Sequence, residues 1–335
     1  MNLNRFDYDL PRSLIAQHPL HRRDHARLMV IDRVNQSIFH DVFSNIRSYL
    51  PSKSMLVLND SKVIPARLLS TRSTGGQVEI FLLRKLEDGY SYEVLMRPTK
   101  RLKNGEIIVF GKSQLVAQIV DKEKRIVRFN KKNINAILGR IGHIPLPPYI
   151  SRLDKAEDKK YYQTVYAKKD GSVASPTAGL HFTSSLLEKI KKDGHAVKKV
   201  TLHVSYGTFK PVEEEDVTNH KMHTEEYSLS ESIFKSIRCA KEKGRKIVSV
   251  GTTSCRTLET VAKNGTLSGS TNIFIYPGCS FQWVDSLITN FHLPKSTLLM
   301  LVYAFGGEDL MRKAYQEAIR EKYRFYSYGD GMIIL

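Results

Sequence analysis

The stretch KIVSVGTTSCRTLETVAKNG, residues 246–265, has the pattern of a buried strand that leads directly into a helix. Residues 247–250 form a short apolar run rich in β-branched side chains, which favours a strand. Gly251 ends this run, and the apolar residues after it recur at helical spacing as far as Gly265. We expect Thr252 or Thr253 to cap the helix, because a hydroxyl oxygen can accept a hydrogen bond from the first turn. A strand followed at once by a helix is the repeating unit of α/β proteins, so this stretch predicts that fold class.

The same alternation of strand and helix extends on both sides of this stretch. Strands are predicted over 27–33, 54–60, 196–204, 271–278 and 285–291, and helices over 183–194, 230–244 and 307–323. Two of the helical patterns end at a glycine, as helices commonly do. We therefore predict an α/β main domain, a mixed sheet with flanking helices, built from residues 1–70 and 150–335.

Residues 77–130 follow a different rhythm. Short runs of alternating apolar and polar residues are separated by turn sequences such as EDG, KNG and DKEK, which predicts consecutive antiparallel hairpins. Strands at this spacing suit a small closed barrel. The proline-dense GHIPLPPYI, residues 142–150, continues neither a helix nor a central strand and marks a boundary. Residues 71–149 are therefore predicted to form an inserted small antiparallel β-barrel domain.

Composition restricts the classes of function. The chain of 335 residues carries a net charge of +18, which favours a polyanionic partner such as nucleic acid, although a merely lysine-rich surface is the alternative. Three cysteines without C-x-x-C spacing argue against a disulfide framework and a zinc ribbon, and no metal site is predicted. The sequence has no G-x-G-x-x-G fingerprint. Because it also has no apolar run of about 18 residues and no signal-peptide pattern, we expect a cytoplasmic protein without membrane contact.

Polar side chains gather in the loops that follow the predicted strands. Residues 251–256 place backbone N–H groups, hydroxyls and Arg256 at a helix start, which favours binding of a carboxylate or phosphate, although simple helix capping remains the alternative. Asn290 and His292 lie in a loop between a strand and an apolar helix. Because α/β proteins bind ligands at the ends of their strands, these loops are expected to form one cleft.

Eight segments, in order, carry a family resemblance: LVLNDSKVIPARL, YQTVYA, SPTAGLHFT, TLHVSYGTFKPV, HKMHTEEY, GTTSCRTLE, LITNFHLPKSTLLML and YRFYSYGDGMIIL. They resemble the signature segments of the S-adenosylmethionine:tRNA ribosyltransferase-isomerases of queuosine biosynthesis, from Phe6 to the C-terminus. The resemblance departs at Ser205-Tyr206, where Gly-Leu is expected, and at Gly331, where Ala is usual. It implies an α/β domain with an inserted β-barrel, in agreement with the pattern above.

The resemblance also implies a reaction. The ribosyl part of S-adenosylmethionine is transferred and isomerised onto 7-aminomethyl-7-deazaguanine at the tRNA wobble position, which gives epoxyqueuosine-tRNA, adenine and methionine. S-adenosylmethionine is then a consumed co-substrate, and no prosthetic group is expected. An RNA methyltransferase that leaves S-adenosylhomocysteine, and a tRNA-binding protein without catalysis, are the alternatives. A monomer without an obligate protein partner is expected.

Acid–base chemistry at the ribosyl 5′ carbon and at the leaving adenine requires proton-transfer groups. The expected catalytic residues are His181, His223, Glu225 and Asp330, with His292 in reserve. The expected substrate-binding residues are Thr177, Gly179, Phe182, Tyr206, Gly207, Gly251, Thr252, Thr253, Ser254, Arg256, Asn290 and His292. The expected tRNA contacts are Lys62, Arg67, Arg97, Lys100 and Arg101.

Overall fold

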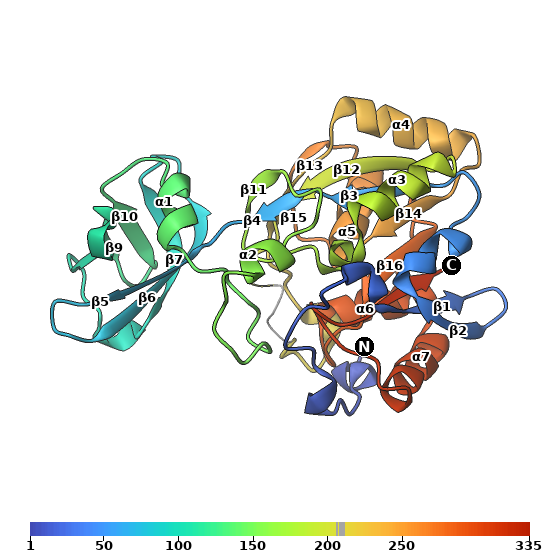
Figure 1. Ribbon diagram of the computed structural model, residues 1–335, viewed down its shortest axis with the longest axis horizontal. Helices are drawn as coiled ribbons and strands as arrows, with labels where there is room; N and C mark the ends of the chain where they lie inside the picture. Colours follow the sequence, from blue (N-terminus) through green and yellow to red (C-terminus); the bar gives the residue numbers. More distant parts are fainter. Residues whose placement is uncertain (206, 208–211) are drawn as a thin grey trace. The chain divides into compact units, whose positions relative to one another are not determined.

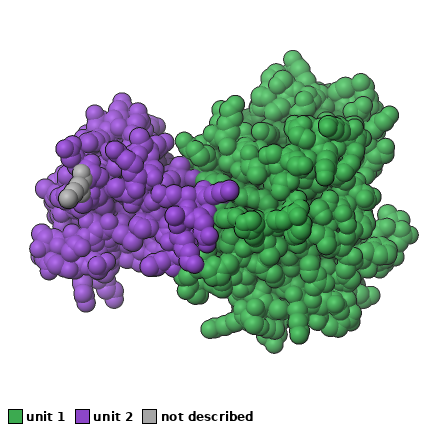
Figure 2. All heavy atoms as spheres, viewed as in Figure 1, with its two compact units in different colours: residues 1–62, 148–152, 161–335 green, residues 63–147, 153–160 purple. Residues whose placement is uncertain are grey.

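The computed structural model describes residues 1–205, 207 and 212–335, apart from the side chain of Lys112. Within these residues the chain forms two compact units, coloured separately in Figure 2. The larger comprises Met1–Lys62, Pro148–Arg152 and Tyr161–Leu335, and the smaller comprises Val63–Pro147 and Leu153–Lys160. The smaller unit begins before residue 71 because the strand Arg67–Thr71 pairs with Gln77–Lys85 and not with the large sheet.

A mixed sheet, nine-stranded within the described residues, forms the centre of the larger unit, in the order β15-β13-β12-β3-β14-β16-β17-β1-β2. Strands β12, β3, β14 and β16 run parallel to one another. The strands are β1 (Arg27–Asp32), β2 (Ser37–Val42), β3 (Met55–Asn59), β12 (Ala196–Leu202), β13 (Glu225–Ser228), β14 (Ile247–Val250), β15 (Ser268–Thr271), β16 (Ser286–Asn290) and β17 (Gly331–Ile334). Because parallel strands end at the same edge, the loops after β12, β14 and β16 meet there.

Helices cover both faces of this sheet (Figure 1). Alternate residues of β3 divide between the faces: Met55 and Val57 pack in one buried cluster, and Leu56 and Leu58 in the other. Residues of α5, α6 and α7 join the first cluster, and residues of α3 join the second. The helices are α3 (Ser184–Lys192), α4 (Glu231–Glu242), α5 (Thr252–Asn264), α6 (Thr297–Gly306) and α7 (Glu308–Arg320).

The smaller unit contains an antiparallel sheet, six-stranded in the part of the chain that is described, in the order β5-β6-β7-β10-β9-β8. Its strands are β5 (Arg67–Thr71), β6 (Gln77–Lys85), β7 (Ser91–Arg97), β8 (Ile107–Val109), β9 (Val116–Asp121) and β10 (Ile126–Phe129), and it also holds α1 (Asn135–Ile141). The two end strands approach each other, since the Ser70 hydroxyl donates to the Val109 carbonyl at 2.5 Å. This barrel-like sheet confirms the predicted fold class. The short helix α2 (Asp158–Tyr161) and a two-stranded pair, β4 (Ser61–Val63) with β11 (Lys169–Ser172), complete the described α-helices and strands.

Two local predictions are wrong. The segment 271–278 is not a strand beyond Thr271, where β15 ends. Its apolar residues, including Ile275, instead pack on the core as a loop. The cap of α5 is Gly251, at φ 89° and ψ 155°, a conformation that glycine adopts without steric cost. Thr252 and Thr253 consequently belong to the first turn of the helix.

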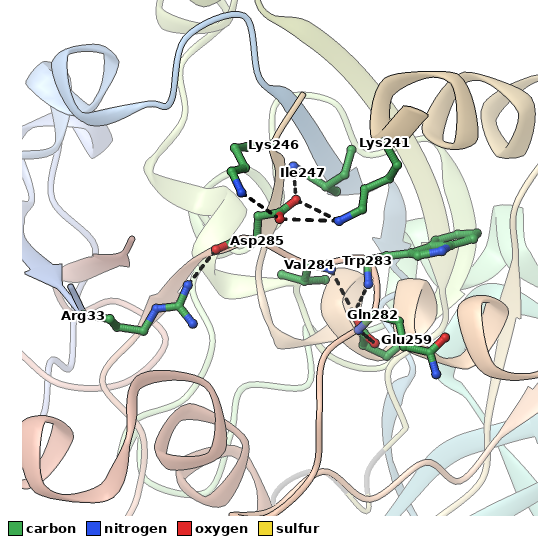
Figure 3. Close-up of polar contacts among 9 residues, drawn as sticks. All are labelled: Arg33, Lys241, Lys246, Ile247, Glu259, Gln282, Trp283, Val284 and Asp285. Carbon is green, nitrogen blue, oxygen red and sulfur yellow. Dashed lines mark hydrogen bonds and ion pairs between the residues drawn. The ribbon is translucent and has the colours of Figure 1, made fainter. Parts of the chain in front are cut away.

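Two carboxylates, buried Glu259 and partly buried Asp285, anchor the helices α5 and α4 (Figure 3). Glu259 of α5 accepts the backbone N–H groups of Gln282, Trp283 and Val284 at 2.7–3.0 Å. Asp285 accepts the N–H of Ile247 at 2.8 Å and pairs with the ammonium groups of Lys241 and Lys246. Charge-assisted bonds of this kind are among the stronger hydrogen bonds in proteins. They tie α5 and α4 to the segment before β16, at the sheet edge where β14 and β16 begin.

Candidate active site

A cavity of about 700 Å³ lies at the carboxyl ends of the parallel strands. Loops that follow β12, β14 and β16 contribute to its wall, as the sequence predicted for a strand-end cleft. Its described lining comprises Tyr149, residues 174–178, Val204, residues 251–253 and 289–293, Ser296, Leu298, Tyr326 and Ser327. Of the predicted substrate-binding residues, this wall includes Thr177, Gly251, Thr252, Thr253, Asn290 and His292.

Aromatic rings form one side of this cavity. The rings of Tyr149 and Tyr326 lie with centroids 4.6 Å apart, and the Tyr149 hydroxyl is 2.6 Å from the Ser327 hydroxyl. Such faces suit a flat heterocycle, because offset aromatic contacts are favourable. Sequence reasoning missed both tyrosines, since they come from segments outside the predicted strand ends.

Asn290, at the end of β16, has an amide orientation that its neighbours determine. Its Nδ2 lies 3.1 Å from the Tyr326 carbonyl and 3.3 Å from the Asp330 carbonyl, so this end must be the amino group. The same nitrogen is 3.1 Å from His181 Nε2, which therefore accepts. The Oδ1 atom is buried without a hydrogen-bond partner among the described residues. Because buried polar atoms are nearly always satisfied, this acceptor is open to a hydrogen bond from a ligand or a water molecule.

His181 supports Asn290 from outside the large cavity. It is the last residue of the short 3-10 helix Thr177–His181, and it is buried. The centroid of its ring lies 4.7 Å from the centroid of the Phe43 ring. Burial lowers the pKa of His181 to about 3, and a hydrogen bond to the Arg23 backbone opposes that shift. The ring is therefore neutral near pH 7, with its proton on Nδ1 and its Nε2 lone pair directed at Asn290.

His292 lines the large cavity directly. Its Nε2 lies 2.8 Å from the Thr289 hydroxyl, and burial lowers the pKa of His292 to about 3. A depressed pKa keeps the imidazole unprotonated near neutral pH and also makes the ring a weaker base than an ordinary histidine.

These two histidines predict a pH dependence of stability. The unfolded chain binds protons near the ordinary pKa of about 6.5, whereas the folded chain binds them only near 3. Stability is therefore complete above about pH 6.5 and falls on acidification, by about 1.4 kcal/mol per pH unit for each histidine. Urea unfolding between about pH 7 and 5 measures this slope. His292→Gln should reduce the slope by about 1.4 kcal/mol per pH unit, and an unchanged slope would refute the assignment.

Further hydrogen-bonding groups lie at the start of α5. The first N–H groups of a helix have no intrahelical acceptor, and Thr252 and Thr253 present theirs at the wall of the large cavity. The Thr253 hydroxyl accepts from Asn59 Nδ2 at 3.1 Å. Ser175 Oγ, on the opposite loop, and Ser254 Oγ are buried and unpaired within the described chain. Ser175 lines the cavity and is not among the predicted site residues.

A smaller cavity of about 370 Å³ adjoins the first through Leu298, which lines both. Its described lining is Gly207, His220, Met222, His223, Glu225, Arg256, Thr297 and Leu298. The smaller cavity therefore brings together four of the predicted residues, His223, Glu225, Arg256 and Gly207. Asn290 and Gly251 line the larger cavity instead. Gly207 lies so close to the His223 ring that a Cβ atom would meet Cδ2 at 2.1 Å.

Glu225 and Arg256 form a buried ion pair at this smaller cavity. Arg256 Nη1 donates to Glu225 Oε2, and the second carboxylate oxygen accepts the Ser205 N–H at 2.9 Å. The Arg256 side chain is 4% exposed and the Glu225 side chain is 2% exposed. Arg256 Nε donates to the Ile273 carbonyl at 3.3 Å. Such a pair orients its members firmly, because each charge depends on the other.

Other predicted residues face away from the cavities. Phe182 is fully buried against Phe43, and a Cβ on Gly179 would meet the Tyr166 hydroxyl at 2.0 Å, so both serve packing. Asp330 accepts the backbone N–H groups of Arg27 and Arg324, while burial raises the pKa of its carboxyl group. Tyr206 lies outside the described residues.

The predicted tRNA contacts differ in their surroundings. Arg67 forms a two-pronged pair with Glu79 at 2.8 and 3.0 Å, and Lys62 lies 3.1 Å from Asp170. Arg97, Lys100 and Arg101 are exposed around one turn of the smaller unit, and none forms an ion pair with a described residue. A cluster of unpaired cations is what a phosphate backbone attracts.

Two other kinds of feature are absent from the described part of the chain. No helix there combines the length and apolar character needed to span a bilayer. No group of three or more His, Cys, Asp or Glu side chains there is placed to hold a metal ion.

A cavity with aromatic walls and few polar groups, at the carboxyl ends of parallel strands, is where α/β enzymes bind substrates. Comparison with known proteins identifies the family. Residues 3–334 match the family model described as Queuosine biosynthesis protein, and the chain belongs to that family.

Individual relatives agree with this assignment over their full length. The S-adenosylmethionine:tRNA ribosyltransferase-isomerase of Sulfurihydrogenibium sp. (strain YO3AOP1) is 51% identical over 337 residues, with 100% of both chains covered. The protein of the same name from Caldanaerobacter subterraneus subsp. tengcongensis is 51% identical over 344 residues, again with 100% of both covered. The crystal structure of S-adenosylmethionine tRNA ribosyltransferase from Thermotoga maritima is 38% identical, with a TM-score of 0.57 over 99% of this chain and 100% of that chain.

Proposed function

We propose that this chain transfers and isomerises the ribosyl moiety of S-adenosylmethionine onto 7-aminomethyl-7-deazaguanine at the tRNA wobble position. The products are epoxyqueuosine-tRNA, adenine and methionine. The observation that carries the proposal beyond family membership is the large cavity, whose tyrosine rings and unsatisfied polar atoms suit a nucleoside. S-adenosylmethionine is consumed, and the proposal includes no prosthetic group.

Asn290 Oδ1 and Ser175 Oγ are the proposed polar anchors in the large cavity. The Asn290 oxygen can accept a hydrogen bond from the amino group of adenine. The Ser175 hydroxyl can donate a hydrogen bond to an acceptor on the ribose or the base. The Tyr149 and Tyr326 rings form one wall against which the heterocycle lies. In this arrangement His181 is a positioning residue, since it touches Asn290 and not the cavity.

Proton transfer is assigned to the imidazoles that line a cavity. The sulfonium acidifies the ribosyl 5′ carbon, and a neutral imidazole can remove a proton there. His292 lines the large cavity and His223 the small one, so both are proposed for acid–base steps. Glu225 and Asp330 have their carboxylates occupied by Arg256 and by backbone N–H groups, so positioning is their proposed role.

The tRNA supplies its target base from the anticodon loop, where a base can leave the stack without breaking a duplex. Arg97, Lys100 and Arg101 are proposed to contact its phosphates. Lys62 and Arg67 stay proposed contacts, although an acidic partner already neutralises each.

The triple variant Arg97→Gln/Lys100→Gln/Arg101→Gln is expected to weaken tRNA binding and to reduce the slope of log K against log salt by about two to three. Each lost phosphate contact removes about 0.7–0.9 from that slope. Filter binding at several salt concentrations measures it. The matched control replaces Lys235, Arg238 and Lys243 of the α4 region, and an equal effect of both triples would contradict a specific patch.

Product analysis distinguishes the proposed reaction from its alternatives. Incubation with S-adenosylmethionine and tRNA carrying the deazaguanine base should release adenine and methionine in equal amounts. S-adenosylhomocysteine would instead identify a methyltransferase, and tRNA binding without turnover would identify a binding protein.

Cytoplasmic location and a monomeric state belong to the same proposal. Both carry over expectations drawn from the sequence. Analytical ultracentrifugation at micromolar concentration checks the monomer, and a stable dimer there would overturn it.

A further inference from the structure

We infer that the smaller cavity binds the carboxylate of the methionyl group, through Arg256 and the N-terminus of α6. This inference rests on the proposed function, since it takes S-adenosylmethionine as the ligand. It assigns the carboxylate to α6, whereas the sequence had suggested the start of α5. Two features carry it: a buried nitrogen of Arg256 that has no hydrogen-bond acceptor among the described residues, and the first turn of α6 in the wall of the same cavity.

Arg256 has one guanidinium nitrogen without a partner. Nη1 donates to Glu225 and Nε to the Ile273 carbonyl, whereas Nη2 is buried without an acceptor among the described residues. Arg256 is 3% exposed and lines the cavity. A buried guanidinium N–H group without an acceptor costs free energy. Arg256 Nη2 is therefore suited to donate a hydrogen bond to an anionic ligand.

The first turn of α6 lies at the same cavity. Ser296 caps this ten-residue helix by accepting the Leu299 N–H, and Thr297 and Leu298 line the cavity at the first two helical positions. Their N–H groups have no intrahelical acceptor, and the helix dipole adds positive potential there. An anion between Arg256 Nη2 and this turn would therefore meet donors from two sides.

The charge at the site is suited to a carboxylate. Glu225 neutralises Arg256, so the empty cavity carries no large uncompensated charge, and one added anion is stabilised by the guanidinium and the dipole together. Leu298 lines both cavities, which allows one ligand to span them with its nucleoside in the larger and its amino-acid end in the smaller. Met222 contributes an apolar wall for the methylene chain.

The test compares S-adenosylmethionine with its decarboxylated analogue, which keeps the sulfonium and lacks only the carboxylate. With saturating tRNA, adenine release from the analogue is expected to show a kcat/KM about 100-fold lower in the wild-type chain, the range of a lost charge-assisted hydrogen bond. Arg256→Lys retains a cation for Glu225 but removes the free nitrogen of the fork. This variant should lower kcat/KM for S-adenosylmethionine and reduce the preference to about threefold or less.

Three results would overturn the inference. One is equal use of both substrates by the wild-type chain, which needs no variant and leaves adenine release, and hence the proposed function, intact. Another is an undiminished preference in folded Arg256→Lys. The third is a tRNA-binding salt slope reduced by about one in Arg256→Lys, since the anion would then be a tRNA phosphate. Arg238→Lys, an exposed substitution on α4, is the matched control and should keep the full preference.

Discussion

Asn290→Asp is expected to lower kcat/KM for S-adenosylmethionine by about 1000-fold, although the two side chains have the same shape. The substitution replaces an amino group by an oxygen, which then faces the Tyr326 and Asp330 carbonyls and the His181 Nε2 lone pair. Hydrogen-bond acceptors that face each other with no hydrogen between them repel one another in a buried site. Loss of a buried hydrogen-bond network also costs more free energy than loss of a single hydrogen bond. About 1000-fold corresponds to about 4 kcal/mol of transition-state stabilisation.

Steady-state kinetics with saturating tRNA measures this loss. The control is Asn264→Asp at the end of α5, where the side chain is exposed and its Oδ1 accepts the Thr266 N–H, a role that Asp keeps. The control should retain full activity. An Asn290→Asp variant with kcat/KM within about tenfold of wild type would show that the hydrogen bonds of the Asn290 amino group do not position its oxygen for the substrate.

Glu225→Ala is expected to lower the free energy of unfolding by about 3–5 kcal/mol, because it leaves the Arg256 guanidinium buried without its partner. Arg256→Met should cost a similar amount for the reciprocal reason. The double variant Glu225→Ala/Arg256→Met removes both charges and should be closer to the wild type than the sum of the two single variants predicts. Urea unfolding at about pH 7 gives the three values.

The cycle also distinguishes a buried pair from a surface one. Exposed ion pairs contribute only about 0–1 kcal/mol, so small and additive effects would contradict the buried pair. Lys235→Ala at the exposed pair with Glu231 provides that reference within the same unit. Loss of adenine release in the double variant would then reflect the missing anion site and not unfolding.

The sequence predicted the architecture where one pattern dominates locally. The βα unit at 247–264 and the hairpins from Gln77 to Phe129 follow from apolar periodicity and turn residues. The segment 271–278 was predicted wrongly, because its apolar residues pack on the core without a strand partner beyond Thr271. The predicted main domain extends to residue 70, whereas the strand Arg67–Thr71 pairs with Gln77–Lys85 in the smaller unit, a pairing that local pattern does not identify.

The site was less accessible to sequence reasoning. Strand-end logic found Asn290, Gly251 and His292, because parallel strands bring their ends together whatever the details. Residue type alone could not show that Phe182 faces the core. Residue type also could not show that Tyr149, which is far from any predicted strand end, faces the cavity. The positions of Phe182 and Tyr149 both depend on how segments distant in sequence pack together.

The most direct test of the central claim uses S-adenosylmethionine labelled with ¹⁴C in the ribose, and a parallel sample labelled in the methyl group. With tRNA carrying the 7-aminomethyl-7-deazaguanine base, ribosyl label should enter the tRNA in step with adenine release, and methyl label should leave with methionine. Methyl label in the tRNA, or ribosyl label that stays in a small molecule while the tRNA is modified, would contradict the account.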